Sequence, residues 1–424
     1  MSGYPASYYA ATATDWPECP ALAGDLRADV CIIGAGYSGL SAALHLAERG
    51  YDVAIIEAER VGFGASGRNG GQLGTGHRKD QRSLEEKLGL EWAKRMWTLA
   101  EDSVATVKDL IAKHNIDCDV KPGVLQAAWK HGEVEWMREE EAHMADQYGY
   151  EQLQFIPAEE MRDMVATKRY HAGLLDKGAA HLHPLNYALG LARAAKAMGV
   201  RIYENSRVTH TTRSDPAVVY TMKGSIKAPH VIVACNGYLH DLEPDMAGHI
   251  MPVNNFIIAT EPLGHTARTL IREDVGVQDT KFVIDYYRLS TDGRLLFGGG
   301  ENYSSKFPKD IAAFVRKPML RVFPQLADAR IDYAWGGTLA ITMSRMPDFG
   351  RLAPNIFYAQ GFSGQGINMA TLAGKLMAEA VAGQAERFDI LSEIKIPSFP
   401  GGTLLRYPGL MLGVLWYTLQ DRLP

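Results

Sequence analysis

Three glycines and one acid at fixed distances are the residues of this 424-residue chain that most clearly predict chemistry. Gly34, Gly36 and Gly39 form a Gly-x-Gly-x-x-Gly motif directly after one apolar run, and Glu57 ends the next apolar run. In such a motif the first glycine makes a tight turn, the second lets the backbone approach a pyrophosphate, and the third lets helix and strand pack closely. An acid about 20 residues later accepts hydrogen bonds from ribose hydroxyls. The spacing therefore predicts a dinucleotide site.

The motif needs a strand, a turn and a helix in this order, and the sequence predicts all three. Residues 29–33 are almost all apolar, as in a buried parallel strand, and apolar residues recur at helical spacing from Leu40 to Ala47. The N-terminus of that helix would offer unpaired N–H groups to the pyrophosphate. Because a carboxylate at Glu57 would repel a 2′-phosphate, NADP is disfavoured, and FAD and NAD remain.

The segment that follows favours FAD over NAD. Residues 60–76 contain seven glycines and few bulky apolar side chains, and Ser66, Asn69 and Gln72 add polar groups. So much unhindered backbone after the ribose-binding strand suggests close main-chain approach to a long, flat ligand. An NAD domain needs no such loop. A mobile surface loop is the alternative reading.

Two later segments are expected to return to the same sheet. Residues 230–237 form a β-rich apolar run that ends in small residues, and residues 355–383 read as a strand, a glycine-rich turn and a long helix. Gly361, Gly364 and Gly366 lead into that helix, whose positive end would face an electron-rich group. Three glycine-bearing strand ends far apart in the sequence suit a ligand as long as FAD.

Seven stretches carry a resemblance to a known family: "SYYAATA", "GAGYSGLSAALHLAERGYDV", "GFGASGRNGGQ", "HLHPLNYALGLARAA", "DYYRLSTDGRLLFGGG", "YAQGFSGQGI" and "AGQAERFD". Through them nearly the whole chain resembles the D-amino-acid oxidase/sarcosine oxidase (DAO) superfamily of FAD-dependent oxidoreductases, most closely the branch that acts on γ-glutamylputrescine. The resemblance implies an α/β fold, with a Rossmann-like FAD-binding domain interleaved with an antiparallel-sheet substrate domain of α+β type. The implied FAD-binding domain comprises residues 26–100, 180–240 and 335–395, the substrate-binding domain residues 101–179 and 241–334, the N-terminal arm residues 1–25 and the C-terminal helical tail residues 396–424.

The motif, the glycine-rich segments and the resemblance together nominate contacts for FAD. The expected cofactor-binding residues are Gly34, Ala35, Gly36, Tyr37, Ser38, Gly39, Glu57, Ala58, Arg60, Ala65, Ser66, Gly67, Arg68, Asn69, Gly70, Gly71, Gln72, Leu73, Val208, Cys235, Asn236, Gly237, Gly361, Phe362, Ser363, Gly364, Gln365, Gly366 and Ile367. Some relatives bond the flavin covalently through a cysteine before the C-terminal flavin loop. Residues 335–355 contain none, so we expect dissociable, non-covalent FAD. We expect no bound metal, because the four cysteines lack metal-ligand spacing.

Substrate contacts are expected on a hairpin and just before the last flavin loop. Two β-rich runs joined around Asp292-Gly293 predict the hairpin. Aromatic side chains there could exclude water, and an arginine could bind a carboxylate in a bidentate pair; the alternative is ordinary half-buried strand residues. The nominated residues are Tyr286, Tyr287, Arg288, Trp335 and Arg345, with His181 and His183 as further polar contacts near the flavin.

The resemblance implies oxidation of a C–N bond of a γ-glutamylated polyamine to an imine, which water hydrolyses to an aldehyde and ammonia, with H2O2 formed if oxygen is the acceptor. The expected partners are a small-molecule amine, and molecular oxygen or another electron acceptor. Two alternatives stay open: a secondary amine or N-alkyl amino acid as substrate, and a non-catalytic, flavin-holding subunit of a larger dehydrogenase. A colourless protein that depends on nicotinamide would instead indicate an NAD enzyme.

Composition is that of a soluble globular protein. The net charge of −5 disfavours nucleic acid as a partner. Four scattered cysteines, without metal-ligand spacing, fit a reducing cytoplasm. No secretory signal is predicted, and the apolar tract at residues 407–420 is too short to span a membrane. We expect this tract to form a terminal helix docked on the protein, with a membrane-surface anchor as the alternative.

Overall fold

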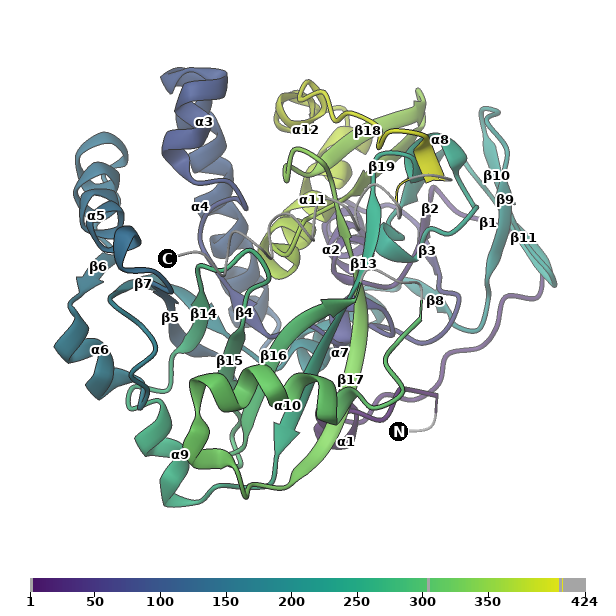
Figure 1. The fold of residues 1–424 in the computed structure, drawn as a ribbon. Helices are drawn as coiled ribbons and strands as arrows, with labels where there is room; N and C mark the ends of the chain where they lie inside the picture. The colour runs from purple at the N-terminus through teal and green to yellow at the C-terminus, as the bar shows by residue number, and fades with distance from the viewer. Residues whose placement is uncertain (1–2, 303–305, 404–405, 407–424) are drawn as a thin grey trace.

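The computed structural model describes residues 3–302, 306–403 and 406, and Figure 1 shows their arrangement. Three β-sheets organise the chain: one of six strands, one of nine and one of four. Helices cover the six-stranded sheet at the upper right of Figure 1, whereas the nine-stranded sheet extends to the lower left. The expected α/β fold with an interleaved, largely antiparallel sheet is confirmed.

The six-stranded sheet has the order β18-β19-β12-β2-β3-β8, and all its pairs are parallel except the edge pair β18–β19. Every residue of β2 and β3 is buried, which explains their continuous apolar sequences. The strands are β2 (Val30–Ile33), β3 (Val53–Ile56), β8 (Arg201–Tyr203), β12 (His230–Val233), β18 (Asp348–Ala353) and β19 (Ile356–Gln360).

Three helices pack on this sheet and share one core with it. They are α2 (Tyr37–Ala47), α7 (Pro184–Ala197) and α11 (Gly366–Val381), beside the longer α4 (Leu90–Lys113). Gly374 allows α11 to lie against α2, because a Cβ at this position would be 2.3 Å from the Ser38 carbonyl oxygen. The expected strand–turn–helix units at residues 29–57 and 355–383 are both confirmed.

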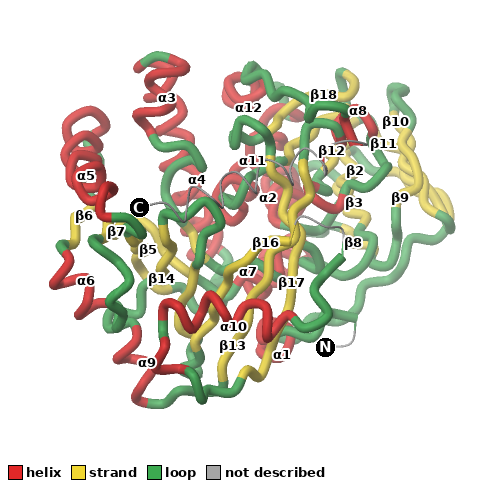
Figure 2. The backbone as a smooth tube through the Cα atoms, in the orientation of Figure 1, coloured by secondary structure: helices red, strands yellow, loops and turns green. Residues whose placement is uncertain are grey.

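The nine-stranded sheet has the order β17-β13-β16-β15-β14-β5-β7-β4, with β6 paired to β7. Apolar side chains of β13 and β16 pack against α10 (Ile311–Val322), which crosses the outer face of the sheet in Figure 2. The strands are β4 (Gln72–Leu73), β5 (Lys121–Ala127), β6 (Leu153–Ile156), β7 (Gly173–His181), β13 (Met251–Thr260), β14 (Gly276–Asp279), β15 (Tyr286–Leu289), β16 (Leu295–Asn302) and β17 (Ile331–Ile341).

The predicted hairpin is β15–β16, closed by a hydrogen bond from the Gly293 N–H to the Ser290 carbonyl oxygen at 3.0 Å. The strands of the four-stranded sheet are β1 (Gly24–Arg27), β9 (Val208–Thr211), β10 (Ala217–Thr221) and β11 (Gly224–Ala228). The remaining helices are α1 (Tyr8–Thr12), α3 (Gln81–Leu88), α5 (Val134–Tyr148), α6 (Ala158–Met164), α8 (Pro244–Ala247), α9 (His265–Leu270) and α12 (Glu386–Ser392).

Four expected domain boundaries fall inside elements. The boundary after residue 25 lies within β1, that after 100 within α4, that after 179 within β7 and that after 334 within β17. Strands β7 and β17 belong to the nine-stranded sheet along their whole length, so a break in either would divide a continuous hydrogen-bonded ladder. Composition does not mark these positions: Gly178, Gly336 and Gly337 lie beside two of them, yet the strands continue through these glycines.

The N-terminal arm lies against the protein. The Tyr9 side chain is fully buried, and the Tyr4 hydroxyl donates to the Val61 carbonyl oxygen at 2.6 Å.

The apolar tract at residues 407–420 lies outside the described residues. Among the helices that the structure describes, none combines the length and apolar character needed to cross a bilayer. The described residues also contain no cluster of three or more histidine, cysteine or acidic side chains that could hold a metal ion.

Candidate functional site

One cavity of about 730 Å³ lies between the six-stranded and nine-stranded sheets. Its lining includes Gly34, Glu57, Asn236 and Ser363, which follow β2, β3, β12 and β19. Because these four strands are parallel, their carboxyl ends meet at one edge of the sheet, which is where ligands bind in open α/β sheets. Segments separated by more than 300 residues in sequence thus form one wall.

Two helix N-termini open onto this wall. Gly36, which has no side chain, is the N-cap of α2, and Gln365, whose side chain makes no cap hydrogen bond, is the N-cap of α11; both line the cavity. The first N–H groups of a helix have no intrahelical acceptor, and the helix dipole places positive charge beside them. Both ends are therefore suited to a negatively charged or electron-rich ligand.

Glu57 lies between these features at the end of β3. Its carboxylate accepts hydrogen bonds from the N–H groups of Ala35 at 2.7 Å and Glu59 at 3.0 Å. Burial raises the pKa of Glu57, and the two backbone donors oppose this rise. A carboxylate held in this way retains lone pairs that ribose hydroxyls could use.

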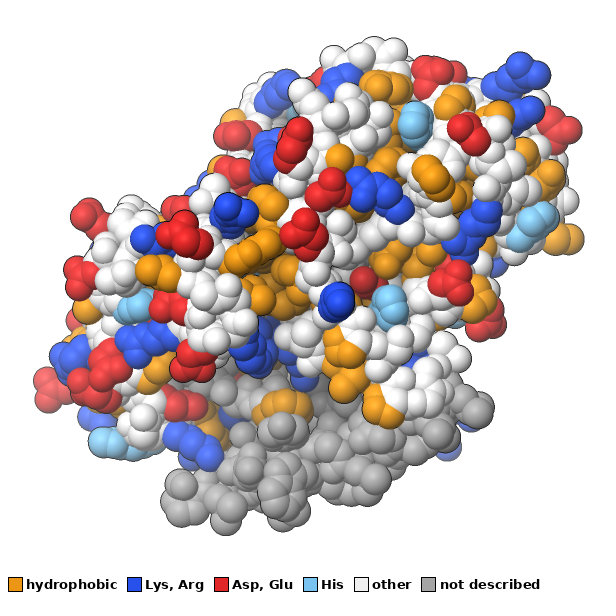
Figure 3. Space-filling view, turned by 90° about the horizontal axis from the view of Figure 1, so that it is seen from above, with side chains coloured by type: hydrophobic (Ala, Val, Ile, Leu, Met, Phe, Trp, Pro, Cys, Tyr) orange, Lys and Arg blue, Asp and Glu red, His pale blue; other side chains and the backbone are white. Residues whose placement is uncertain are grey.

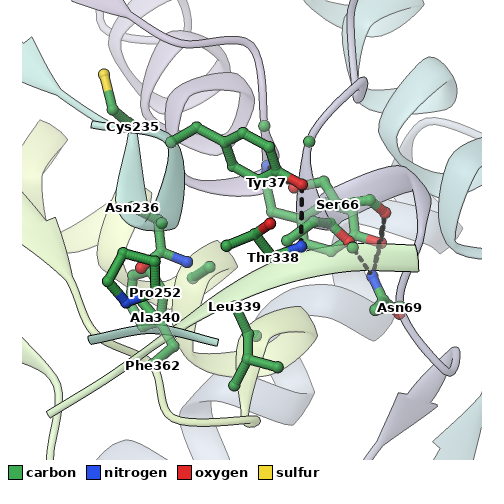
Figure 4. Close-up of a pocket in the computed structure, with 18 of the residues that line it drawn as sticks. Tyr37, Ser66, Asn69, Cys235, Asn236, Pro252, Thr338, Leu339, Ala340 and Phe362 are labelled. Atoms are coloured by element: carbon green, nitrogen blue, oxygen red, sulfur yellow. Dashed lines mark hydrogen bonds between the residues drawn. The ribbon is translucent and has the colours of Figure 1, made fainter. Parts of the chain in front are cut away.

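The glycine-rich segment forms the next part of the wall. The Ser66 hydroxyl accepts from the Tyr37 N–H at 3.1 Å, and the Asn69 amide donates to the Tyr37 hydroxyl at 3.1 Å and to the Ser66 carbonyl oxygen at 3.1 Å. Figure 4 shows these three side chains together, across the cavity from Asn236 and Phe362. Their bonds order the segment against the start of α2.

Comparisons with known proteins decide the family. A family model described as "FAD dependent oxidoreductase" (DAO) matches residues 29–380. The chain belongs to this family. It is 43% identical over 425 aligned positions to the gamma-glutamylputrescine oxidoreductase of Escherichia coli (strain K12), covering 100% of both chains. It is 42% identical to the probable oxidoreductase OrdL of Rhizobium meliloti (strain 1021), covering 98% of this chain and 97% of that one.

Solved structures share the fold. Glycine oxidase from Geobacillus kaustophilus aligns with a TM-score of 0.72 at 22% identity, over 85% of this chain and 95% of the other. The L-proline dehydrogenase from P. horikoshii aligns with a TM-score of 0.70 at 22% identity, over 86% and 96%. The DAO family is FAD-dependent, and the two helix N-termini, the acid after β3 and the small residues between them fit a flavin dinucleotide.

Most of the expected cofactor residues line this cavity. They are Gly34, Gly36, Tyr37, Ser38, Glu57, Ala58, Ala65, Ser66, Arg68, Asn69, Gly70, Gln72, Val208, Cys235, Asn236, Gly237, Phe362, Ser363, Gly364, Gln365, Gly366 and Ile367. Others lie behind the wall and do not line it: Ala35, Gly39, Arg60, Gly67, Gly71, Leu73 and Gly361. Arg60, for example, forms a buried ion pair at 3.0 Å with Glu204, so its role is to anchor the loop.

The structure separates the expected substrate contacts into two groups. Tyr286 and Arg345 line the cavity, whereas Tyr287, Arg288 and Trp335 do not. Arg288 is 1% exposed, because Tyr9 and the Gly70 carbonyl oxygen cover it. The Trp335 indole donates to the Arg68 carbonyl oxygen at 3.1 Å, and the Tyr287 ring stacks on Phe297. The structure therefore places these three side chains behind the cavity wall.

The two histidines also lie away from the cavity lining. His181 Nε2 bonds to the Asp274 carbonyl oxygen at 2.6 Å, and His183 caps α7 by accepting from the Asn186 N–H at 3.1 Å. Burial, together with the nearby Arg288, lowers the pKa of each imidazole to about 3. Both rings are neutral structural groups, and neither contacts the site.

Sequence reasoning missed the wall that the nine-stranded sheet supplies. Its residues come from β5, β13, β14, β17 and the segment before β15, and only strand register brings them together. They include Val124, Asn254, Asn255, Gln278, Phe282, Ile284 and Thr338.

Seen from above, acidic and basic side chains are interspersed over the surface, without one extended patch of either sign on that face (Figure 3).

Proposed function

We propose that the protein oxidises the terminal C–N bond of a γ-glutamylated polyamine such as γ-glutamylputrescine. The observation that carries the proposal is 43% identity over the full chain to an oxidoreductase of that name. The overall reaction converts a primary ammonium, O2 and water into an aldehyde, ammonium and H2O2. When bound, FAD accepts the hydrogen and electron pair that leave the amine carbon, and oxygen is the proposed final acceptor.

The residues proposed to hold FAD are those of the sheet edge. The α2 N-terminus would bind the pyrophosphate and Glu57 the ribose, while the α11 N-terminus would stabilise negative charge on the flavin. We propose that the cofactor is non-covalent. Cys235 is the cysteine that lines the cavity; burial raises the pKa of its thiol to about 12, so the nucleophilic thiolate is scarce.

Tyr286 is proposed as the aromatic wall beside the reacting amine. Its ring lies tightly between two glycines: a Cβ on Gly70 would be 2.5 Å from Cε2, and one on Gly298 would be 2.1 Å from Cζ. Its hydroxyl donates to Asn255 Oδ1, which lines the same cavity. A ring fixed in this way would exclude water and limit the poses of the substrate.

Four free cysteines support a cytoplasmic location, where thiols stay reduced. The acidic net charge and the mixed surface support small molecules, not nucleic acid, as partners. The relatives named glycine oxidase and 4-methylaminobutanoate oxidase are only 23% and 27% identical, so the secondary-amine alternative is less favoured. Full-length identity of 43% to an oxidoreductase makes the non-catalytic alternative less favoured as well.

The test is anaerobic mixing of the flavin-loaded protein with γ-glutamylputrescine, putrescine or sarcosine, followed by flavin absorbance. We expect rapid bleaching with γ-glutamylputrescine alone, and H2O2 after air is admitted. Bleaching by sarcosine without bleaching by γ-glutamylputrescine would overturn the proposal. Reduction that requires an added partner protein would support the subunit alternative instead.

A further inference from the structure

Arginines are the main charged groups of the cavity lining, and most of them are held by the protein. Arg207 forms an ion pair with Glu59 at 2.8 Å, Arg68 donates to the Phe63 carbonyl oxygen at 2.7 Å, and Arg406 donates to the Ala247 carbonyl oxygen at 2.8 Å. Arg78 is exposed at the margin. Arg345 differs from the others.

The Arg345 guanidinium contacts the Phe282 ring at 5.7 Å from its centroid. No carboxylate of the described residues lies within 4 Å of it, and it donates no side-chain hydrogen bond to them. Its backbone has φ +64°, a left-handed conformation that costs a residue with a Cβ about 1–2 kcal/mol. Such strain in a cavity wall points to a side chain whose direction matters for function.

Arg345 also occupies one end of the cavity. It lies three residues before Asp348, which pairs with Gln360 at the carboxyl end of β19. From β18 the sheet runs through β19, β12 and β2 to β3, where Glu57 ends the strand. Four strand spacings of about 4.8 Å place β18, which follows Arg345, roughly 19 Å from β3. The cation therefore lies far from Glu57 and Glu59, the carboxylates among the described lining residues.

We propose that Arg345 binds the free α-carboxylate of the glutamyl group and so selects the acylated amine over the free diamine. This inference rests on the proposed function. A guanidinium binds a carboxylate through two parallel hydrogen bonds, and Phe282 beneath it lowers its exposure to water. A free diamine carries two positive charges and no carboxylate, so the same end of the cavity repels it. Arg345 is thus a specificity-determining residue.

The test compares Arg345→Met with the wild type on two matched substrates: γ-glutamylputrescine and its α-carboxamide, which keeps the shape but loses the negative charge. We expect kcat/KM for the carboxylate to fall about 100-fold and kcat/KM for the carboxamide to change less than about threefold. Arg345→Lys should give an intermediate loss, because an ammonium keeps the charge without the bidentate geometry. Equal losses on both substrates would overturn the inference.

Arg95→Met is the matched control. Arg95 lies exposed on α4, its guanidinium likewise contacts an aromatic ring, that of Trp92 at 5.6 Å, and it does not line the cavity. Both substrates should react with this variant as with the wild type. Flavin content and thermal midpoint, measured for every variant, identify any that misfold.

A binding measurement separates this inference from the proposed function. γ-Glutamylbutylamide lacks the terminal amine, so its affinity can be measured by calorimetry on the flavin-loaded protein without turnover. We expect wild type and Arg95→Met to bind it, and Arg345→Met to bind it about 100-fold more weakly. If γ-glutamylputrescine is not oxidised but this pattern holds, the proposed reaction fails and the carboxylate site stands. If the wild type does not bind the probe, the inference is wrong.

Discussion

Replacing Lys281 should weaken the fold through two buried carboxylates. Asp279 and Asp285 are 2% and 1% exposed, and Lys281 Nζ forms ion pairs with both, at 3.3 Å to Asp279. The Asp279 N–H donates to the Asp285 carbonyl oxygen at 2.9 Å and closes the loop between them. Phe282, which lines the cavity, belongs to this loop.

Lys281→Met would leave two buried negative charges without their cation. Removing one partner of a buried pair costs about 3–5 kcal/mol, since the remaining charge keeps its desolvation penalty. With a urea m-value of about 3 kcal/mol/M, the unfolding midpoint should fall by roughly 1 to 1.7 M. Loss of the loop geometry should also raise KM for the amine, because Phe282 packs under Arg345.

The loss should depend on pH. Burial raises the pKa of Asp279 from 3.8 to about 7, and the Lys281 charge opposes this rise. As pH rises from about 4 to about 7, the folded state keeps a proton that the unfolded state has released, so the free energy of unfolding falls, by up to about 1.4 kcal/mol per pH unit. Without the ammonium the pKa rises further, and the fall should continue to higher pH.

Urea titrations at about pH 5 and pH 9, followed by tryptophan fluorescence, measure this effect. The difference between wild type and Lys281→Met should be small at the lower pH and largest at the higher. Lys317→Met, an exposed residue of α10, is the control and should leave both midpoints unchanged. A difference below about 1 kcal/mol, or one that is equal at both pH values, would refute the reasoning.

Three further predictions concern FAD. Gly39→Ala would place a Cβ 2.0 Å from the Gly34 carbonyl oxygen, so the purified protein should contain little or no flavin, whereas Gly132→Ala, outside the cavity lining and with no atom within 4 Å of its Cβ, should retain it; equal flavin-to-protein ratios would contradict this. Glu57→Lys should lower flavin affinity at least about tenfold by equilibrium dialysis, because the ribose acceptor is lost; unchanged affinity would exclude the ribose role. Acid precipitation should release all yellow colour into the supernatant, and a coloured pellet would show a covalent link.

Local signals predicted the nucleotide end of the site well. The turn at Gly34, the helix from Tyr37 and the acid at Glu57 all follow from residues within one stretch of about 30, where strand, helix and glycine patterns act on neighbouring backbone. The hairpin around Gly293 was predictable for the same reason. In these segments few tertiary contacts are needed to decide the structure.

The substrate end was less predictable because long-range packing decides it. Tyr286 and Arg288 are two residues apart on β15 and so point to the same face of the sheet, yet only Tyr286 reaches the cavity. Arg288 is covered by Tyr9, which is 279 positions away in the sequence. Neither strand alternation nor residue type reveals that the N-terminal arm covers this part of the face.

The position of residues 60–76 explains why this segment contains so many glycines. It begins after β3 of the six-stranded sheet and ends beyond β4 of the nine-stranded sheet, so it joins the two walls of the cavity. None of its residues is exposed, which excludes the mobile surface loop considered from sequence alone. A Cβ on Gly67 would lie 2.3 Å from the Gly62 carbonyl oxygen, and one on Gly71 2.2 Å from that of Leu182. These glycines allow backbone to pack on backbone where the sheets meet, so larger side chains there would separate the two walls between which the cavity lies.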